Sequence, residues 1–150
     1  DRIEPATAAY VHKLLKLNEN VQILDVSNAC LGFLNSMVLG ASMIESGIAR
    51  TILIVSGEDG RPLVENTIEH LLSKDLSRNE IKPFFANLTI GSGAVGAVVA
   101  KRKLVKKPLL SFLGGISVTD SNANDLCEGI EMGRNGVEMQ VILIALLVIR

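Results

Sequence analysis

The 150-residue chain has no tryptophan, and aromatic side chains make up only 3% of it. Its core must therefore be built from aliphatic side chains, and an apolar content of 48% supplies enough of them for one domain. With only 4 prolines and 13 glycines, the composition fits neither a collagen-like nor a disordered chain. A formal net charge of −1 argues against dedicated nucleic-acid binding.

Cysteine and histidine are equally scarce. Cys30 and Cys127 stand far apart without a CxxC pair, and the only histidines are His12 and His70. No cluster has the spacing of a zinc site, so we expect neither a metal nor another bound cofactor. A disulfide between the two cysteines stays open, although nothing indicates a secreted scaffold. The start lacks a methionine and a signal-like apolar segment, which favours a cytoplasmic protein and a piece of a longer chain.

Apolar periodicity predicts an α/β chain. We expect a helix from Pro5 to about Leu17, a buried strand over 21–26, a helix over 30–46 ended by Gly47, and a buried strand over 51–56. Two such strands joined by a helix form a βαβ unit. Further expected elements are a helix over 61–72, a polar connection over 73–82, strands over 89–100 and 108–118, an irregular segment over 119–136, and a buried terminal strand from 141. That last apolar run is too short to cross a bilayer, so no membrane association is expected.

Cys30 is the most informative residue, because it stands where the apolar strand meets the helical pattern. Leu31, Leu34 and Val38 begin that pattern directly after it. Free backbone N–H groups and the positive end of a helix dipole favour a thiolate at such a joint. A tight strand-to-helix turn is also how several folds expose a nucleophile. The alternative is a buried structural cysteine, the commoner role of a free cysteine.

Four segments carry a family resemblance. Residues 25–33 (DVSNACLGF) resemble the active-site segment of the 3-oxoacyl-(acyl carrier protein) synthase III family, within the thiolase-like superfamily. Residues 5–8, 54–58 and 88–99 resemble, in order, the preceding helix opening, the following strand and loop, and the Gly-rich hairpin of that family. The resemblance implies a thiolase-like half-domain over 1–100, with a mixed, mostly parallel sheet and a buried nucleophile helix. Residues 101–150 would be a linker and partial start of the C-terminal half, with a truncated or non-native tail.

The resemblance implies acyl transfer in fatty-acid or lipid metabolism. Cys30 would attack an acyl thioester, its backbone N–H would help hold the oxyanion, and a second thioester would then condense in a Claisen reaction. The implied partners are acyl-CoA or acyl carrier protein, or both, and a second copy of the chain in a homodimer. Residues 28–33 and 89–95 look closer to the olefin-pathway enzymes, which condense two long acyl-CoAs. Fatty-acid initiation enzymes more often have an acidic residue where Ser92 stands.

The sequence departs from the family in one respect. The family's catalytic His and Asn belong to a C-terminal half that this chain lacks, and we interpret His12 and His70 as surface or capping residues. The alternative function is therefore a catalytically incomplete fragment or pseudoenzyme half, which accepts acyl groups without condensing them. A thiol-dependent hydrolase or acyltransferase of another fold is a third option, which a His–Asp pair near Cys30 would favour.

Other motifs carry less weight. Residues 91–96 match GxGxxG, but a strand continues after them where a dinucleotide site needs a helix. Residues 101–107 hold five basic side chains, either a solvated connector or a surface for acidic carrier protein or coenzyme A phosphates. Asp25, Glu58 and Asp59 do not form a convincing acid/base pair. Cys127 lies in a polar segment and is interpreted as incidental.

Overall fold

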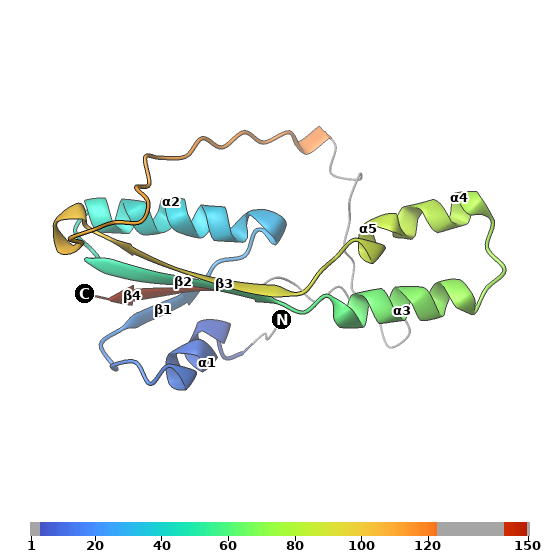
Figure 1. Cartoon of the computed structure of the whole chain (residues 1–150), viewed down its shortest axis with the longest axis horizontal. Coiled ribbons are helices and arrows are strands. Elements are labelled where there is room, and N and C mark those ends of the chain that lie inside the picture. Colours follow the sequence, from blue (N-terminus) through green and yellow to red (C-terminus); the bar gives the residue numbers. More distant parts are fainter. Residues whose placement is uncertain (1–3, 123–142, 150) are drawn as a thin grey trace. The chain divides into compact units, whose positions relative to one another are not determined.

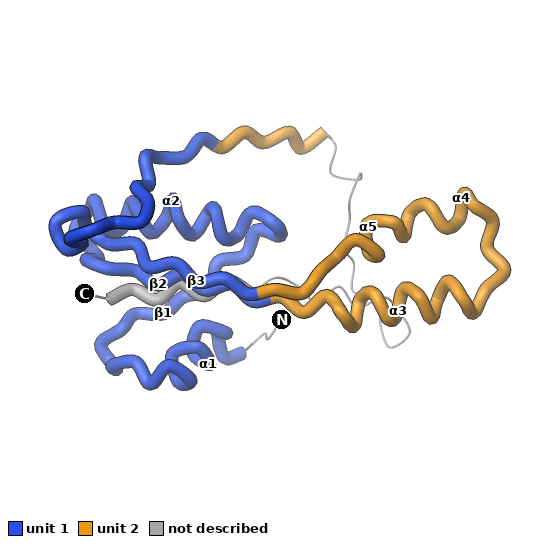
Figure 2. The backbone as a smooth tube through the Cα atoms, in the orientation of Figure 1, with its two compact units in different colours: residues 1–57, 94–116, 142–150 blue, residues 58–93, 117–141 orange. Residues whose placement is uncertain are grey.

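The structure, a computed structural model, describes residues 4–122 and 143–149, the latter by their backbone alone. The chain divides into two compact units (Figure 2). Unit 1 comprises 1–57, 94–116 and 142–150, and unit 2 comprises 58–93 and 117–141. The two units are not the predicted half-domain over 1–100 and partial second half over 101–150. That predicted division is not tested by the structure and stays a prediction.

Unit 1 is built on a four-stranded sheet with the order β1-β4-β2-β3. Its strands are β1 (Gln22–Asp25), β2 (Thr51–Glu58), β3 (Gly93–Ala100) and β4 (Leu143–Ile149). Strand β4 pairs antiparallel with both β1 and β2, so that Leu146 stands opposite Leu24 on one side and Ile54 on the other. The expected parallel neighbours β1 and β2 do share one direction, but a strand from far along the chain separates them. The prediction of a mostly parallel sheet is wrong at these two pairings.

Helices α1 (Thr7–Leu14) and α2 (Gly32–Glu45) cover opposite faces of this sheet (Figure 1). Apolar side chains of β2 pack on both faces of the sheet, because successive side chains of a strand point to opposite sides. Ile52 and Ile54 are fully buried in one cluster with Ile44 of α2. Leu53 packs on the other side, against the buried Ala8 of α1.

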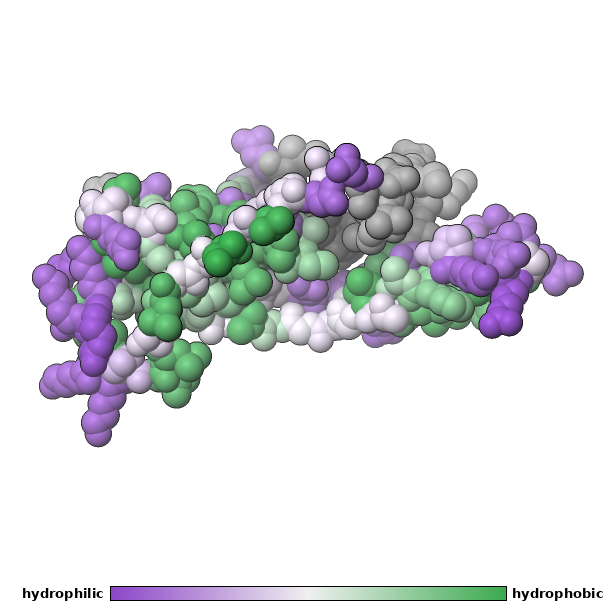
Figure 3. Space-filling model, turned by 90° about the horizontal axis from the view of Figure 1, so that it is seen from above, coloured by the Kyte–Doolittle hydropathy of each residue, from purple (hydrophilic) through white to green (hydrophobic). Residues whose placement is uncertain are grey.

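Small residues bring α2 close to the sheet. Its buried positions recur every fourth residue, at Gly32, Ser36, Gly40 and Ile44. A Cβ atom on Gly40 would lie 3.3 Å from Cδ1 of Ile52, so the contact is tight. The opposite face exposes Leu31, Leu34 and Val38, and Figure 3 shows apolar side chains open to solvent on this side. Within the described residues, the expected buried nucleophile helix is buried along one stripe only.

The amino end of α1 is capped by a residue of β1. Its N-cap, Ala6, has no side-chain acceptor. The Asp25 carboxylate accepts instead from Thr7 N at 2.7 Å and Ala8 N at 2.8 Å. These bonds satisfy two free helical N–H groups and place a negative charge at the positive end of the helix. Asp25 therefore joins α1 to the strand that leads to Cys30.

Unit 2 contains α3 (Arg61–Leu72), which has the predicted bounds, and two short helices, α4 (Arg78–Ile81) and α5 (Phe85–Leu88). Thr67 of α3 is fully buried, and its Oγ1 accepts from Asn87 Nδ2 at 3.2 Å. The segment predicted as a polar connection holds α4, which begins with a capping box between Ser77 and Glu80. The sequence signal for this helix, a Ser followed three residues later by Glu, was present but not used.

The strand predicted over 108–118 does not form. This segment has no regular structure, and Leu109 is 95% exposed. It passes α2 at Gly115, where an added Cβ would lie 2.9 Å from Val38 Cγ2. A strand needs a neighbour for its backbone groups, and no strand pairs with this segment in the described ranges. Most of 119–136 lies outside the described residues, whereas the terminal strand is confirmed as β4. None of the helices described here has both the length and the apolar character needed to cross a bilayer.

Candidate active site

Cys30 lies at the predicted strand-to-helix joint. Strand β1 ends at Asp25, a single 3₁₀ turn η1 (Ala29–Leu31) follows, and α2 begins at Gly32. Cys30 sits inside this turn, and its side chain is a free, exposed thiol. The structural alternative of a buried core cysteine is therefore wrong for this chain.

The backbone turns sharply just before the thiol. Ala29 has a φ of 42°, in the left-handed region that ordinary residues avoid at a cost of about 1–2 kcal/mol. Such a conformation persists only where its surroundings hold it. The residue before it, Asn28, is extended at a φ of −160°. These two residues lie in the connection from β1 to α2, directly before the exposed Cys30.

Asn28 takes the N-cap position of η1 without capping it by its side chain. Its carbonyl accepts from Leu31 N at 2.9 Å, and its Nδ2 donates to Asn35 Oδ1 at 2.6 Å. No acceptor meets the Cys30 N–H among the described residues. That N–H is therefore available to an anionic oxygen of a ligand, which is the requirement for an oxyanion donor.

Neither histidine pairs with Cys30. His12 Nε2 lies 3.0 Å from the Asn18 carbonyl oxygen, and the His70 ring packs against Phe84 with 5.1 Å between centroids. In the described part of the chain, neither forms a hydrogen bond with a carboxylate. A His–Asp pair near Cys30 would have favoured the hydrolase or acyltransferase of another fold, so no observation on the described residues supports that option.

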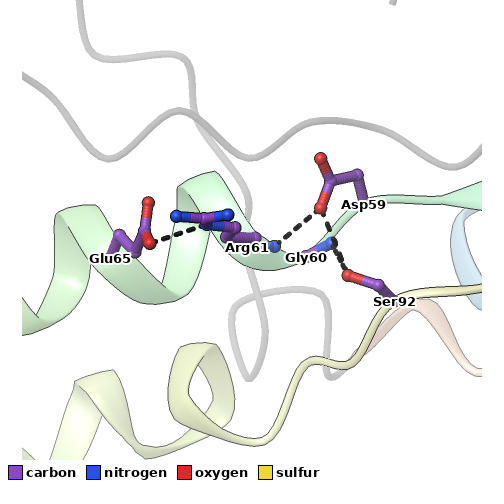
Figure 4. Close-up of polar contacts among 5 residues, drawn as sticks. All are labelled: Asp59, Gly60, Arg61, Glu65 and Ser92. Atoms are coloured by element: carbon purple, nitrogen blue, oxygen red, sulfur yellow. Dashed lines mark hydrogen bonds and ion pairs between the residues drawn. The ribbon is translucent and has the colours of Figure 1, made fainter.

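Asp59, Gly60 and Ser92 bring two loops of unit 2 together (Figure 4). Ser92 Oγ accepts from Gly60 N at 3.0 Å and donates to Asp59 Oδ1 at 3.2 Å. The approach requires glycine, because a Cβ on Gly60 would lie 2.6 Å from the Gly91 carbonyl oxygen. Strand β3 then runs to Ala100, so the GxGxxG segment opens no helix and lacks the context of a dinucleotide site, as predicted.

Asp59 also accepts from Arg61 N at 3.1 Å, so its carboxylate organises the start of α3 and does not pair with Glu58 as an acid/base group. The Arg61 side chain also forms an ion pair, because its Nε donates at 2.7 Å to Glu65, which lies one turn further along α3 (Figure 4). This bond, with the charge of Glu65, raises the pKa of the Arg61 guanidinium. Both side chains are largely exposed, so the pair contributes little to stability.

The basic segment over 101–107 lies at the end of α2 opposite to Cys30. Lys101 N donates to the Arg50 carbonyl at 3.2 Å, which brings the segment beside the chain leaving α2. Cys30 precedes the other end of this 14-residue helix, whose length corresponds to about 21 Å. The basic segment is therefore not part of the immediate surroundings of the thiol. Cys127 lies outside the described residues.

Comparison with known proteins agrees with this geometry. Residues 24–114 match the model of the family described as 3-oxoacyl-[acyl-carrier-protein (ACP)] synthase III. The chain is 36% identical over 129 residues to the acyl-CoA:acyl-CoA alkyltransferase of Xanthomonas campestris pv. campestris, covering 86% of this chain and 38% of that protein. It is 35% identical over 141 residues to the enzyme of that name from Shewanella oneidensis, covering 90% and 40%.

A crystal structure of Xanthomonas campestris OleA, a cysteine-to-serine variant with bound lauric acid and lauroyl-CoA, superposes with a TM-score of 0.79. The identity is 35%, over 87% of this chain and 38% of that one. This likeness supports the expected thiolase-like fold. The chain spans about two fifths of the length of these relatives. Because the family match covers more than half of its residues, the chain belongs to the 3-oxoacyl-[acyl-carrier-protein] synthase III family.

Proposed function

We propose that the protein transfers an acyl group from an acyl thioester to Cys30 and condenses it with a second acyl thioester. The observation that carries the proposal is an exposed thiol on a sharp strand-to-helix turn, with its own N–H unpaired in the described structure. Two curated relatives named acyl-CoA:acyl-CoA alkyltransferase favour acyl-CoA for both substrates. Other relatives, named 3-oxoacyl- or beta-ketoacyl-[acyl-carrier-protein] synthase, keep an acyl carrier protein as the second candidate carrier of the acyl group.

In the first step, the Cys30 thiolate attacks the carbonyl carbon of the acyl thioester. The new C–S bond gives a tetrahedral oxyanion, which the Cys30 N–H stabilises by a charge-assisted hydrogen bond. Collapse of this intermediate breaks the original C–S bond and releases the thiolate of coenzyme A. The acyl group is then held as a thioester on Cys30.

In the second step, a base removes a proton from the α-carbon of the second acyl thioester. The resulting carbanion attacks the Cys30 thioester, so a C–C bond forms while the C–S bond to Cys30 breaks. The products are a β-ketoacyl thioester and the free Cys30 thiolate. This step needs a proton acceptor beyond Cys30, because the thiol is occupied by the acyl group.

Glu4 is the candidate acceptor within this chain, and sequence analysis did not single it out. Solved structures of Xanthomonas campestris OleA include variants in which a glutamate, the cysteine or a histidine is replaced. Counted along that protein, the replaced glutamate precedes the replaced cysteine by as many residues as Glu4 precedes Cys30 here. Glu4 is exposed and lies just before α1, whose amino end Asp25 holds.

The acylation step is tested by incubating the chain with lauroyl-CoA and recording its intact mass. We expect one lauroyl adduct, absent in Cys30→Ser and retained in Cys127→Ser, the matched replacement of the other cysteine. Loss of the adduct in Cys127→Ser alone, or an adduct that survives Cys30→Ser, would assign acylation to another residue. No adduct in any variant would overturn the proposal.

Condensation is tested separately, by assaying a β-ketoacyl product from two lauroyl-CoA molecules. Glu4→Gln should keep the adduct and lose the product, whereas Glu19→Gln, a matched change in the exposed turn before β1, should keep both. An adduct without product in the unmodified chain supports the incomplete half-enzyme. That outcome is favoured by one observation, the engagement of both histidines away from Cys30.

The remaining partners follow from the family. We propose a homodimer acting in the cytoplasm, without nucleic-acid or membrane partners and without a bound cofactor. Light scattering after size-exclusion chromatography should give twice the mass of the chain. A monomer over the micromolar range would contradict the dimer and leave the acylation test unaffected.

A further inference from the structure

We propose that Asn28 and Asn35 form a clamp that positions Cys30 for acylation. Both are positioning residues, because their side chains hold the chain around the thiol and do not touch the reacting atoms. The assignment rests on the proposed function for its catalytic consequence. The structural part, a side-chain bond that fixes the nucleophile turn, stands on the geometry alone.

The bond joins the two sides of the turn. Asn28 follows β1 and Asn35 is the fourth residue of α2, with Cys30 between them in sequence. The 2.6 Å bond from Asn28 Nδ2 to Asn35 Oδ1 therefore closes a loop of chain that contains the nucleophile. No other side-chain hydrogen bond spans this turn in the part of the chain that the structure describes.

The Asn28 side chain bonds to Asn35 and does not cap the turn that it precedes. An asparagine at an N-cap position ordinarily accepts from the N–H two or three residues later. Here the side chain makes no cap bond and reaches seven residues onward. The result leaves the Cys30 N–H free of a local acceptor, whereas a capping side chain would compete for the first N–H groups of the turn.

The clamp also accounts for the strained backbone. Ala29, between Asn28 and Cys30, holds a φ of 42°, which relaxes unless its flanks are fixed. Asn28, directly before Ala29, is held by two bonds. Its carbonyl oxygen accepts from Leu31 N, and its side chain donates to Asn35. Because both side chains are neutral amides, they set the direction of Cys30 without adding a charge beside its thiolate.

The structural part is tested by amide hydrogen exchange at Leu31, whose N–H bond to Asn28 depends on the turn. Asn35→Leu, which keeps the shape and removes the acceptor, should raise its exchange rate about tenfold or more. Asn35→Asp keeps an oxygen acceptor and should retain most of the protection. Asn66→Ala, a change on α3 at a side chain that forms no hydrogen bond with the described residues, serves as the control. Equal protection in Asn35→Leu and the unmodified chain would overturn the clamp.

The catalytic part is tested by measuring two rates in each variant. One is the rate of lauroyl transfer from lauroyl-CoA to Cys30, and the other is the rate of Cys30 alkylation by iodoacetamide. Loss of orientation should slow acyl transfer about tenfold or more in Asn28→Ala and Asn35→Leu, with no further loss in the double variant. The rate of Cys30 alkylation by iodoacetamide should differ less than twofold between these variants and the unmodified chain at every pH measured. This small reagent can reach the thiol from any direction. Independent, additive losses would overturn the clamp. If the unmodified chain takes no acyl group, the proposed function fails, and the exchange experiment still decides the clamp.

Discussion

The carboxylate of Asp25 binds the first two N–H groups of the helix that begins at Thr7, eighteen residues earlier in the chain. It links the entry of α1, beside Glu4, to the strand that leads to Cys30. A single side chain thus holds the start of the helix that follows Glu4 against the strand that precedes Cys30. Its removal should affect both the fold and the second step.

Asp25→Ala should lower the free energy of unfolding by about 1–2 kcal/mol, because two charge-assisted bonds and a helix cap are lost. Asp25→Asn keeps one acceptor and should lose about half of that. Urea unfolding followed by circular dichroism measures both. Asp75→Ala, at an exposed carboxylate of unit 2 that makes no bond within the described ranges, should change stability by less than about 0.5 kcal/mol. Equal effects at the two sites would argue against capping by Asp25.

Gly60→Ala should destabilise unit 2 by about 1–3 kcal/mol, because its Cβ would lie 2.6 Å from the Gly91 carbonyl oxygen. The matched change is Gly57→Ala, since no atom of the described residues lies within 4 Å of an added Cβ there. We expect Gly57→Ala to be neutral or slightly stabilising. Proteolysis of the loops at 59–60 and 90–92 should be faster only in Gly60→Ala. A well-tolerated alanine at 60 would show that the two loops do not approach as closely as described.

Ser36→Ala should stabilise the chain by about 1 kcal/mol. The Ser36 hydroxyl is fully buried on the sheet side of α2 and finds no hydrogen-bond partner among the described residues. Its removal abolishes the cost of an unpaired polar group and leaves the β-carbon in place. Ser42→Ala on the exposed side removes a bond of 2.9 Å to the Val38 carbonyl and serves as the comparison. Thermal unfolding gives the sign, and destabilisation by Ser36→Ala would indicate a partner for this hydroxyl.

The start of α4 should depend on pH through Glu80. Hydrogen bonds from the Ser77 hydroxyl and N–H, the latter at 2.9 Å, lower the pKa of the Glu80 carboxyl below its ordinary value. The folded helix therefore favours the ionised form. Its contribution to stability is present above the ordinary pKa and is lost as the pH falls through the lowered folded value. A carbon-13 titration of the Glu80 carboxyl should show the lowered pKa, and Ser77→Ala should move it back up.

Patterns local in sequence predicted most of the elements. Helix α3 was predicted with the right bounds, because the apolar face begun by Leu63 is a local signal. Gly47, with a φ of 82°, ends the region of α2 as expected. The joint at Cys30 followed from the change of period between Val26 and Leu31. These features need no knowledge of distant residues.

Features set by distant partners were missed. The segment from Pro108 reads as a strand by composition, yet no strand pairs with it in the described structure. The capping role of Asp25 could not be predicted, because nothing in its own neighbourhood reveals the helix that it caps. The Asn28–Asn35 bond and the φ of Ala29 depend on how the turn closes, which composition does not specify.

The position of β4 has a consequence for the order of folding. Strands β1 and β2 are complete by residue 58, but neither pairs with the other, and both meet through residues 143–149. During synthesis, the inner edges of these apolar strands stay open until the ribosome has added some eighty further residues. Contacts so distant in sequence close slowly, and open edges invite pairing with other chains. We therefore expect the nascent chain to need chaperones after its first 58 residues have left the ribosome, until 143–149 have also emerged.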